Sequence, residues 1–187
     1  MKVWFTSDTH FGQERTRQLS RRPFSSVQSM DETLRVNWNT NVGPEDVVYH
    51  LGDFGKPDIV SRLTGRSIYL LVGNYDTPEV QGELLARDER ISLIPGPTTT
   101  FDKLENVGLP ALRLIHEPEN ADDPNAFYLF GHIHKLQMVK QNGLNVGVDC
   151  HDFRPIDLET VKFYYDAIMQ HYDHNVFAPH LGRAFGI

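Results

Sequence analysis

The pattern that most constrains the fold is an alternation of apolar runs and helical segments in the first half of the chain. Each apolar run is short and rich in β-prone residues, and each stops at a polar turn. The segments between the runs place apolar residues at helical spacing, and Ser25 or Ser26 and Thr77 can cap two of the helices. This order predicts βαβ units. The predicted strands cover 3–6, 46–51 and 67–72, and the predicted helices cover 26–40, 57–63 and 78–86.

The second half of the chain has a different pattern, with short strand-like runs and little helix between them. A final amphipathic helix is predicted over 158–170, and Asn142-Gly143 is typical of a two-residue hairpin turn. A chain of 187 residues is long enough for one substantial core. We therefore expect one α/β domain over residues 1–170, with two packed sheets and outer helices, and a C-terminal tail at 171–187 that is docked or partly mobile. The strand-like runs lie at 111–115, 126–130, 137–140 and 144–148.

Charge and composition argue against several classes of protein. The formal net charge of −7 argues against a protein that coats nucleic acid, because such proteins carry a basic surface. No apolar run approaches the roughly 20 residues that span a bilayer, so we expect no membrane association. Cys150 is the single cysteine, which excludes an intrachain disulfide and fits a reducing compartment. We therefore expect a cytoplasmic protein.

Five strand ends carry residue types that bind metal ions. In open α/β folds the ligand site lies beyond the carboxyl ends of the strands, so these residues are expected to lie close together. Any one of them alone has a simpler explanation, as a turn former or a hydrogen-bonded side chain. Five such segments in succession are much harder to explain in that way. They are Asp8-Thr-His10, Gly52-Asp53, Gly73-Asn74-Tyr75-Asp76, His116 and Gly131-His132-Ile-His134.

The ligand types narrow the choice of metal. Imidazole and carboxylate together suit Mn, Fe, Zn or Ni rather than Ca or Mg alone. The absence of clustered cysteines argues against a structural zinc site. Seven candidate ligands exceed the needs of one tetrahedral ion, whereas two ions that share a carboxylate use all of them. Two metal ions about 3.5–4 Å apart stabilise the attacking and leaving oxygens of an in-line displacement, which indicates phosphoester hydrolysis.

In this order, the motifs Asp-x-His, Gly-Asp, Gly-Asn-x-Asp, a single His and Gly-His-x-His resemble those of the calcineurin-like metallophosphoesterase superfamily. The matching residues span Asp8 to His134. The resemblance implies an α/β fold of two packed mixed β-sheets flanked by helices, a four-layer αββα sandwich with metals at the sheet edges. A small bacterial and phage branch of the superfamily is similar in the segments Phe5-Thr-Ser-Asp-Thr-His-Phe-Gly12, Arg22-Pro-Phe24 and Asn145-Val-Gly-Val-Asp149.

The resemblance also implies a ligand set and a mechanism. Asp53 would bridge two divalent ions, and a metal-activated hydroxide between them would attack phosphorus. The metals of the family vary among Mn, Fe, Zn and Ni, and we favour Mn. Carried over by position, the ligands of the first ion would be Asp8, His10, Asp53 and His134, and those of the second ion would be Asp53, Asn74, His116 and His132.

One position departs from the motif of the family. In many relatives a His follows the motif's Asn and helps to protonate the leaving oxygen, but this chain has Tyr75 after Asn74. A phenol titrates near about 10, so Tyr75 can donate a hydrogen bond but supplies no imidazolium. Tyr75 is therefore either a catalytic hydrogen-bond donor or a packing residue. The expected catalytic positions are Asp53, Asn74, Tyr75 and Asp76, the last of which orients its neighbours.

Four arginines follow the first motif, and they form either a solvated loop or part of a substrate site. In the second interpretation, Arg21 and Arg22 reach over the metals and hold a substrate phosphate. This prediction is open to a direct structural comparison, because a phosphate-binding guanidinium has to face the metal site.

The predicted function is that of a dinuclear metal-dependent phosphoesterase acting on a small phosphorylated substrate. The substrate is a monoester or a diester, with the diester favoured. Two alternatives stay open. The first is a non-catalytic metal-binding scaffold of the same fold, and the second is a nuclease, for which nucleic acid would be the substrate rather than a bound partner.

Overall fold

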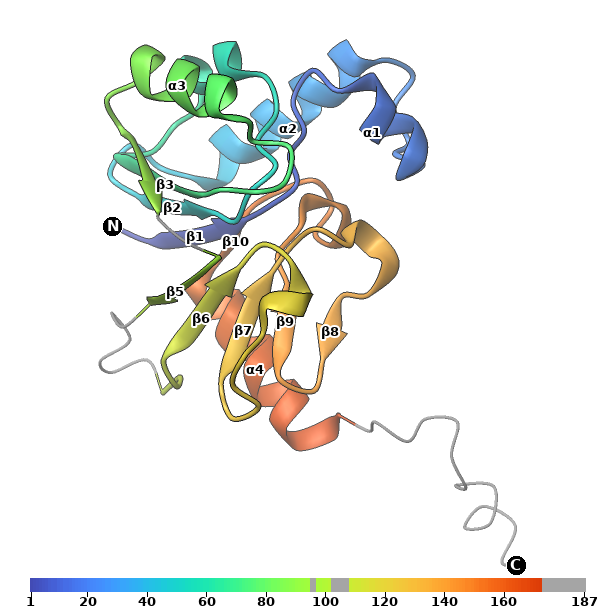
Figure 1. Ribbon diagram of the computed structural model, residues 1–187. Coiled ribbons are helices and arrows are strands. Elements are labelled where there is room, and N and C mark those ends of the chain that lie inside the picture. Colours follow the sequence, from blue (N-terminus) through green and yellow to red (C-terminus); the bar gives the residue numbers. More distant parts are fainter. Residues whose placement is uncertain (95–96, 102–107, 173–187) are drawn as a thin grey trace, which may run out of the picture.

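The structure is a computed structural model, and it describes residues 1–94, 97–101 and 108–172. Two mixed five-stranded sheets pack together and are flanked by helices, which confirms the predicted fold class (Figure 1). Of the predicted tail, only His171 and Tyr172 belong to the described residues, and 173–187 lie outside them. The site and the core both lie within the described part.

Sheet 1 comes from the N-terminal half of the chain and one late strand. Its order is β10-β1-β2-β3-β4, with β1 to β4 parallel and β10 antiparallel to β1. Parallel pairing brings the carboxyl ends of β1, β2 and β3 to the same edge of the sheet. The strands are β1 (Val3–Thr6), β2 (Val47–His50), β3 (Ser67–Leu71), β4 (Ile91–Ile94) and β10 (Ile156–Asp157).

Sheet 2 comes from the second half of the chain. Its order is β5-β6-β7-β9-β8, in which the three central strands are parallel and the two edge strands are antiparallel to their neighbours. Strands β6 and β7 end directly before His116 and Gly131. The strands are β5 (Thr98–Phe101), β6 (Leu112–Ile115), β7 (Phe127–Phe130), β8 (Val139–Lys140) and β9 (Gly143–Asn145).

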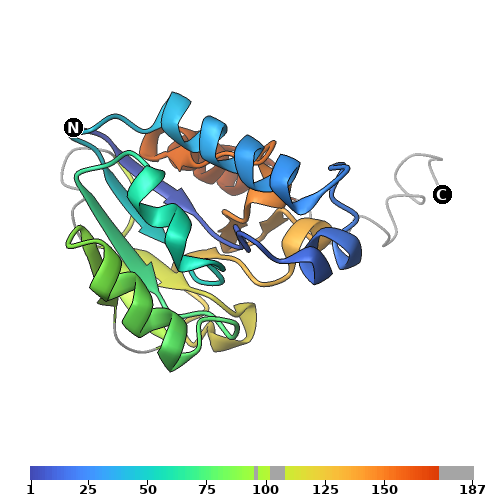
Figure 2. The same cartoon turned by 90° about the horizontal axis from the view of Figure 1, so that it is seen from above.

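The long helices begin at capping residues that the sequence supplies. Ser26 accepts a hydrogen bond from the backbone of Ser29 at the start of α2, and Thr77 and Asp157 do the same for α3 and α4. Helices α2 and α3 lie over sheet 1, and α4 packs against β1, β9 and β10 (Figures 1 and 2). The α-helices are α1 (Glu14–Leu19), α2 (Val27–Asn41), α3 (Pro78–Arg87) and α4 (Leu158–His171), and the 3₁₀ helices are η1 (Pro57–Arg62), η2 (Pro118–Asn120), η3 (His134–Leu136) and η4 (Val148–Cys150).

Two apolar clusters hold these layers together. The first joins sheet 1 to α2 and α3, with Met30, Leu34 and Trp38 of α2 buried against strand residues such as Ile68. The second joins the inner faces of both sheets to α4. Burial of each large apolar side chain stabilises the fold by about 1.5–3 kcal/mol, so the clusters fix the sheets whose edges carry the site. The second cluster contains Phe5, Leu51, Leu112, Leu114, Leu129, Val161 and Ile168.

The helix predictions agree with the structure to within one residue for α2, α3 and α4, whereas η1 is a 3₁₀ helix. The predicted hairpin turn is wrong by one residue. Lys140 pairs with Gly143, so the turn consists of Gln141 and Asn142. Gly143 belongs to β9, where a Cβ would lie 3.0 Å from the carbonyl oxygen of Tyr128, so the glycine serves close strand packing rather than the turn.

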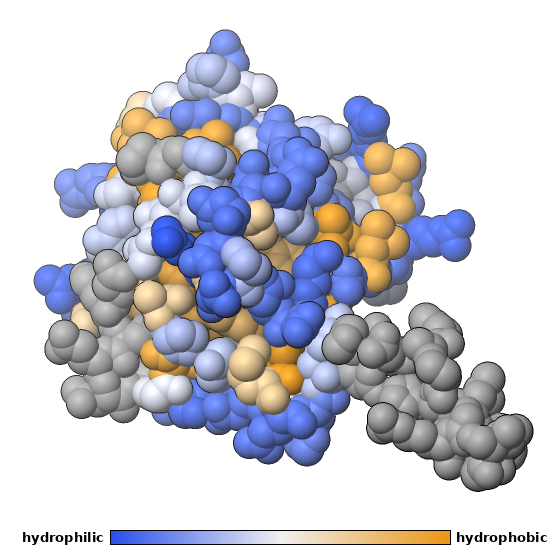
Figure 3. Space-filling model, turned by 60° about the horizontal axis from the view of Figure 1, so that its bottom comes forward, coloured by the Kyte–Doolittle hydropathy of each residue, from blue (hydrophilic) through white to orange (hydrophobic). Residues whose placement is uncertain are grey.

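None of the helices among the described residues combines the length and apolarity that a bilayer crossing requires. On the face drawn in Figure 3, hydrophilic side chains predominate and apolar ones are gathered in small patches.

His50 is buried at the end of β2, and its protonation opposes folding. Thr9 Oγ1 donates a hydrogen bond to the carbonyl oxygen of Phe54, so it must accept one from His50 Nε2–H, 2.9 Å away. His50 Nδ1 is then a buried acceptor without a partner among the described residues. Burial lowers the pKa of His50 from 6.5 to about 3. The imidazole is therefore neutral in the folded protein.

This burial predicts a specific acid sensitivity. Between pH 6.5 and pH 3 the unfolded chain binds a proton at His50 that the folded chain does not. The free energy of unfolding should therefore fall as the pH drops through this window, by up to about 1.4 kcal/mol per pH unit from this group. Urea titrations of wild type and His50→Phe from pH 7 to pH 4 measure the difference. An identical pH slope in both proteins would contradict the assignment.

Candidate metal centre

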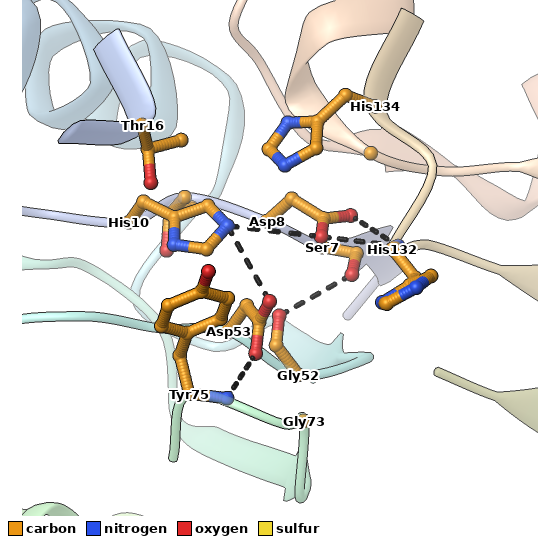
Figure 4. Close-up of polar contacts among 12 residues, drawn as sticks. Ser7, Asp8, His10, Thr16, Gly52, Asp53, Gly73, Tyr75, His132 and His134 are labelled. Carbon is orange, nitrogen blue, oxygen red and sulfur yellow. Dashed lines mark hydrogen bonds and ion pairs between the residues drawn. The ribbon is translucent and has the colours of Figure 1, made fainter. Parts of the chain in front are cut away.

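The segments that follow the strands are joined by backbone hydrogen bonds. The amide of Asp8 donates to the carbonyl oxygen of Gly52 and that of His10 donates to Asp53, each at 3.0 Å. From sheet 2, the amide of His132 donates to both carboxylate oxygens of Asp8, at 3.0 Å each. The strand ends of both sheets therefore meet at one place, and Figure 4 shows their side chains turned toward one another.

The backbone at this meeting point has an unusual conformation. Five of the seven predicted ligands have a positive φ, which is uncommon for residues other than glycine. Each such residue costs on the order of 1–3 kcal/mol and persists only where the surrounding structure imposes it. Strain concentrated in this way is a mark of a functional site. The angles are 57° for Asp8, 50° for His10, 61° for Asp53, 69° for His132 and 50° for His134.

Two glycines allow the loops to approach this closely. A Cβ on Gly73 would overlap with the Asp53 carboxylate, and a Cβ on Gly131 would overlap with Ser7 and with the carboxylate of Asp8. The glycines of the Gly-Asn and Gly-His motifs are therefore required for space beside the two carboxylates.

His10 is oriented so that its free nitrogen faces carboxylates. Its Nδ1 lies 2.8 Å from Gln13 Oε1, which can only accept, so Nδ1 carries the proton. Its Nε2 is buried without a hydrogen-bond partner in the described part of the chain, 3.4 Å from Asp53 Oδ2 and 3.9 Å from Asp8 Oδ1. A bare imidazole lone pair beside two carboxylates is repulsive unless a cation lies between them. Asp8, His10 and His134 form one group that could hold such an ion.

His116 is oriented in the same way on the other side of Asp53. Its Nδ1 donates to the carbonyl oxygen of Leu51 at 2.7 Å, and its Nε2 lies 3.4 Å from Asp53 Oδ2 and 3.0 Å from Asn74 Oδ1. Burial lowers the pKa of His116, but the bond to Asp53 and the charges of Asp8 and Asp53 outweigh it and raise that pKa to about 9. The raised pKa reflects a negative potential that would also attract a cation.

The second group that could hold an ion contains Asp8, Asp53 and His116. Asn74 Oδ1 also lies 3.2 Å from His132 Nδ1, which places His132 beside this group. All seven predicted ligands therefore come together, and Asp53 Oδ2 is at the same distance from the two inward imidazole nitrogens. Asp8 belongs to both groups, so two carboxylates rather than one lie between them.

Arg22 is placed differently from the prediction. Its guanidinium is fully buried, and it donates to both carboxylate oxygens of Asp149 at 2.9 and 2.8 Å and to the carbonyl oxygens of Asp8 and Thr9. Its remaining donor lies against the sulfur of Met30. The predicted substrate contact of Arg22 is therefore wrong in this structure, because no donor is left to bind a phosphate.

Asp149 is a site residue that sequence reasoning did not identify. Its Oδ2 lies 2.7 Å from His134 Nδ1, so Arg22 and Asp149 connect the Asp8 loop to the orientation of His134. Burial raises the pKa of Asp149, but the hydrogen bonds from His134 and Arg22 outweigh it and lower that pKa to about 2. The segment Asn145-Val-Gly-Val-Asp149 carried a family signal but no indication of this role. Gln13, which orients His10, gave no signal at all.

Asp76 organises the loop that carries Asp53. Its carboxylate accepts hydrogen bonds from the backbone amides of Asp53, Phe54 and Gly73, at 2.7–2.9 Å. It is buried and makes no contact with the inward imidazoles, so it acts on the site through the backbone. Burial raises the pKa of Asp76 more than these donors lower it.

Tyr75 and Arg21 lie at the open side of the centre. The backbone amide of Tyr75 donates to Asp53 Oδ1 at 2.9 Å, and the phenol ring is exposed beside His10, with ring centroids 5.4 Å apart. Arg21 is exposed and lines the same hollow as Tyr75. Of the two predicted phosphate-binding arginines, Arg21 is the one that can still reach a substrate.

Two packed sheets carry carboxylates and imidazoles at their joined edges, in groups that could hold metal ions. The chain belongs to the calcineurin-like phosphoesterase superfamily, whose domain model matches residues 1–148. That span contains all seven predicted ligands.

Relatives of similar length come from an archaeon and from phages. An uncharacterized protein of Methanocaldococcus jannaschii is 27% identical over 177 residues, covering 86% of this chain and 89% of its own. The gene 66 protein of Mycobacterium phage D29 is 27% identical over 187 residues, covering 83% and 92%. A protein of unknown function from Aquifex aeolicus has a similar fold, with a TM-score of 0.65 and 21% identity over 87% of this chain and 98% of its own.

Proposed function

We propose that the protein hydrolyses a phosphate monoester or diester with two bound divalent cations, with manganese and the diester favoured. The observation that carries this proposal is the position of Asp53 Oδ2, 3.4 Å from His10 Nε2 and 3.4 Å from His116 Nε2. One carboxylate oxygen between two inward imidazoles, each with its outer nitrogen already hydrogen bonded, is the arrangement that two cations sharing a ligand require.

The donor set fits two such cations. When bound, the cations supply Lewis acidity and activate a water molecule for attack on phosphorus. The chain orients three of the four imidazoles through Gln13, Leu51 and Asp149, and it orients the Asp53 loop through Asp76. One cation would be held by Asp8, His10, Asp53 and His134, and the other by Asp53, Asn74, His116 and His132.

Two observations weigh against the alternatives. A scaffold that has lost catalysis is free to lose metal ligands, whereas this chain keeps every candidate ligand that the family motifs contain. A nuclease would need a cationic surface along its substrate, whereas this chain has a net charge of −7. The phosphoesterase proposal therefore accounts for more of the structure than either alternative does.

Metal reconstitution tests the proposal. The metal-free protein is loaded with Mn, Fe, Zn or Ni, the bound metal is counted by mass spectrometry, and hydrolysis of p-nitrophenyl phosphate and bis(p-nitrophenyl) phosphate is followed. We expect two ions per chain, turnover that a chelator removes, and the faster rate on the diester. Two bound ions without turnover of either ester would favour the scaffold, and salt-dependent binding of DNA or RNA would favour the nuclease.

Tyr75→His should change the choice of leaving group. A histidine beside the centre can protonate a poor leaving oxygen, and general acid catalysis of this kind contributes about a hundredfold or more. We expect the variant to accelerate hydrolysis of alkyl phosphodiesters and to leave p-nitrophenyl esters nearly unchanged. Tyr75→Phe serves as the control for the hydroxyl alone. Rates on alkyl esters that stay the same or fall in Tyr75→His would show that this position takes no part in protonation.

A further inference from the structure

A hollow of about 430 Å³ opens directly beside the candidate metal centre. The imidazoles of His10, His132 and His134 form part of its wall, so the hollow is continuous with the site. Its other walls come from α1 with the residues that follow it, from Tyr75, and from η3. A group in this hollow can therefore be bonded to a phosphate at the metal centre.

The rim of this hollow is apolar to an unusual degree. Among the described residues, eight large hydrophobic side chains are exposed, and three of them line this one hollow. Leu19 at the end of α1 is 69% exposed, Leu136 in η3 is 85% exposed and Tyr75 is 40% exposed. Exposed apolar side chains gathered beside a polar centre mark a binding surface.

Two cationic side chains accompany the apolar rim. Arg21 and Lys135 both line the hollow, and both are exposed. In the ranges that the structure describes, neither forms an ion pair with a carboxylate. Unpaired cations beside three imidazoles favour an anionic group, while the leucines and the phenol ring favour a flat apolar one.

We propose that this hollow binds the organic part of the substrate, so that the substrate is a phosphoester carrying an aromatic group, either an aryl ring or a nucleobase. This inference rests on the proposed function for the place of the phosphate, and it adds the class of group attached to it. The ring lies between Leu19, Leu136 and Tyr75, and Arg21 and Lys135 contact the charged oxygens of the same molecule. A diester fits better than a monoester, because its second ester group can occupy the apolar rim.

Binding of non-hydrolysable anions tests the inference without turnover. At a pH above the second pKa of both acids, phenylphosphonate and methylphosphonate carry the same charge and differ only in the organic group on phosphorus. On the manganese-loaded protein, calorimetry should give a Kd for phenylphosphonate about tenfold lower than that for methylphosphonate. Equal Kd values for the two anions in the wild-type protein would overturn the inference.

Substitutions at the rim test which residues cause the tighter binding of phenylphosphonate. Leu19→Ala and Leu136→Ala should each reduce the ratio of the methylphosphonate Kd to the phenylphosphonate Kd by about threefold. The double variant should remove most of this preference. Because both side chains are exposed, neither change disturbs the core. Leu85→Ala on α3 is the matched control, since Leu85 is 47% exposed and lies outside the hollow. A loss of preference in Leu85→Ala equal to that in Leu136→Ala would contradict the assignment.

Substitution of a cationic side chain should affect the two phosphonates differently from substitution of a leucine. Arg21→Ala should weaken both phosphonates by a similar factor of about threefold to tenfold, because it removes charge rather than apolar surface. Arg66→Ala is the control, since Arg66 is also exposed and without an ion pair in the described part of the chain. If Arg21→Ala weakened only phenylphosphonate, the proposed division between ring and charge would be wrong.

Hydrolysis then separates this inference from the proposed function. Turnover of bis(p-nitrophenyl) phosphate is measured beside the ratio of the Kd values for the two phosphonates, so that catalysis and binding of the ring are read independently. Absence of turnover together with an intact phenyl preference would contradict the proposed function and leave the inferred binding site in place. Turnover without any phenyl preference would overturn this inference and leave the proposed function in place. A change in oligomeric mass in Leu136→Ala with unchanged Kd values would show that a second copy covers the rim, which also overturns the inference.

Discussion

Asp53→Asn is expected to reduce metal-dependent hydrolysis by at least about a hundredfold, the largest effect of any single substitution in this chain. Its Oδ2 lies between the two inward imidazole nitrogens, so the amide removes the charge that both cations would share. The change is isosteric, and the amide oxygen can still accept the hydrogen bond from Tyr75 N–H. The fold should therefore persist while kcat and the metal content fall.

Asp58→Asn is the matched control for this prediction. Asp58 is an exposed aspartate in η1 whose ion pair with Lys56 is on the surface, so its loss should leave turnover and metal content unchanged. Circular dichroism of both variants checks the fold. If Asp53→Asn kept turnover within about tenfold of wild type, an arrangement of cations around Asp53 could not be the source of catalysis.

Arg22→Met is expected to destabilise the protein by about 3 kcal/mol, because it leaves the buried carboxylate of Asp149 without its guanidinium partner and with only the hydrogen bond from His134. The two side chains are 0% and 2% exposed. The pKa of Asp149 is lowered from 3.8 to about 2, so the stabilisation by its charged form is complete above pH 4 and is lost as the pH falls toward 2. Urea denaturation at pH 7 and at pH 3 measures the free energy of unfolding and should show a smaller difference between the proteins at pH 3.

Arg35→Met is the control for Arg22→Met. Arg35 pairs with Glu32 on the exposed surface of α2, and loss of such a pair changes stability by less than about 1 kcal/mol. Arg22→Met should also weaken manganese binding by about tenfold to a hundredfold, since Asp149 is then no longer held in place by Arg22 and positions His134 less firmly. The double variant Arg22→Met/Asp149→Asn should recover stability but not manganese affinity. Equal destabilisation by Arg22→Met and Arg35→Met would contradict the role of the buried pair.

The sequence was sufficient to predict the long helices and most of the strands, because the patterns that define them are local. Ser26 and Thr77 cap α2 and α3, and apolar spacing over many residues defines each long helix. The helices and strands that it missed include α1, β4, β5 and β10, which have between two and six residues each. Helix α1 has six residues and no side-chain cap, and β10 has two residues that form a strand only because β1 pairs with them. Such elements depend on tertiary contacts that no local pattern contains.

The same distinction applies to the site. The meeting of the seven candidate ligands could be predicted because each follows a strand, and parallel strands bring their ends together. The pairing of Arg22 with Asp149 joins residues 127 positions apart, so the run of arginines gave no sign that one of them is buried. The exposure of Leu19 and Leu136 is equally a tertiary property, and in sequence they are two ordinary leucines.

The left-handed backbone at five ligand positions has a consequence for how the centre can change over evolutionary time. The cost of that conformation is met by the hydrogen bonds and packing of the two sheets, and those contacts are all made by the polypeptide itself. The conformation of these loops therefore depends on backbone contacts and not on which cation the side chains would bind. A lineage can then exchange one transition metal for another through side-chain chemistry and cellular supply, without rebuilding the loops that hold it.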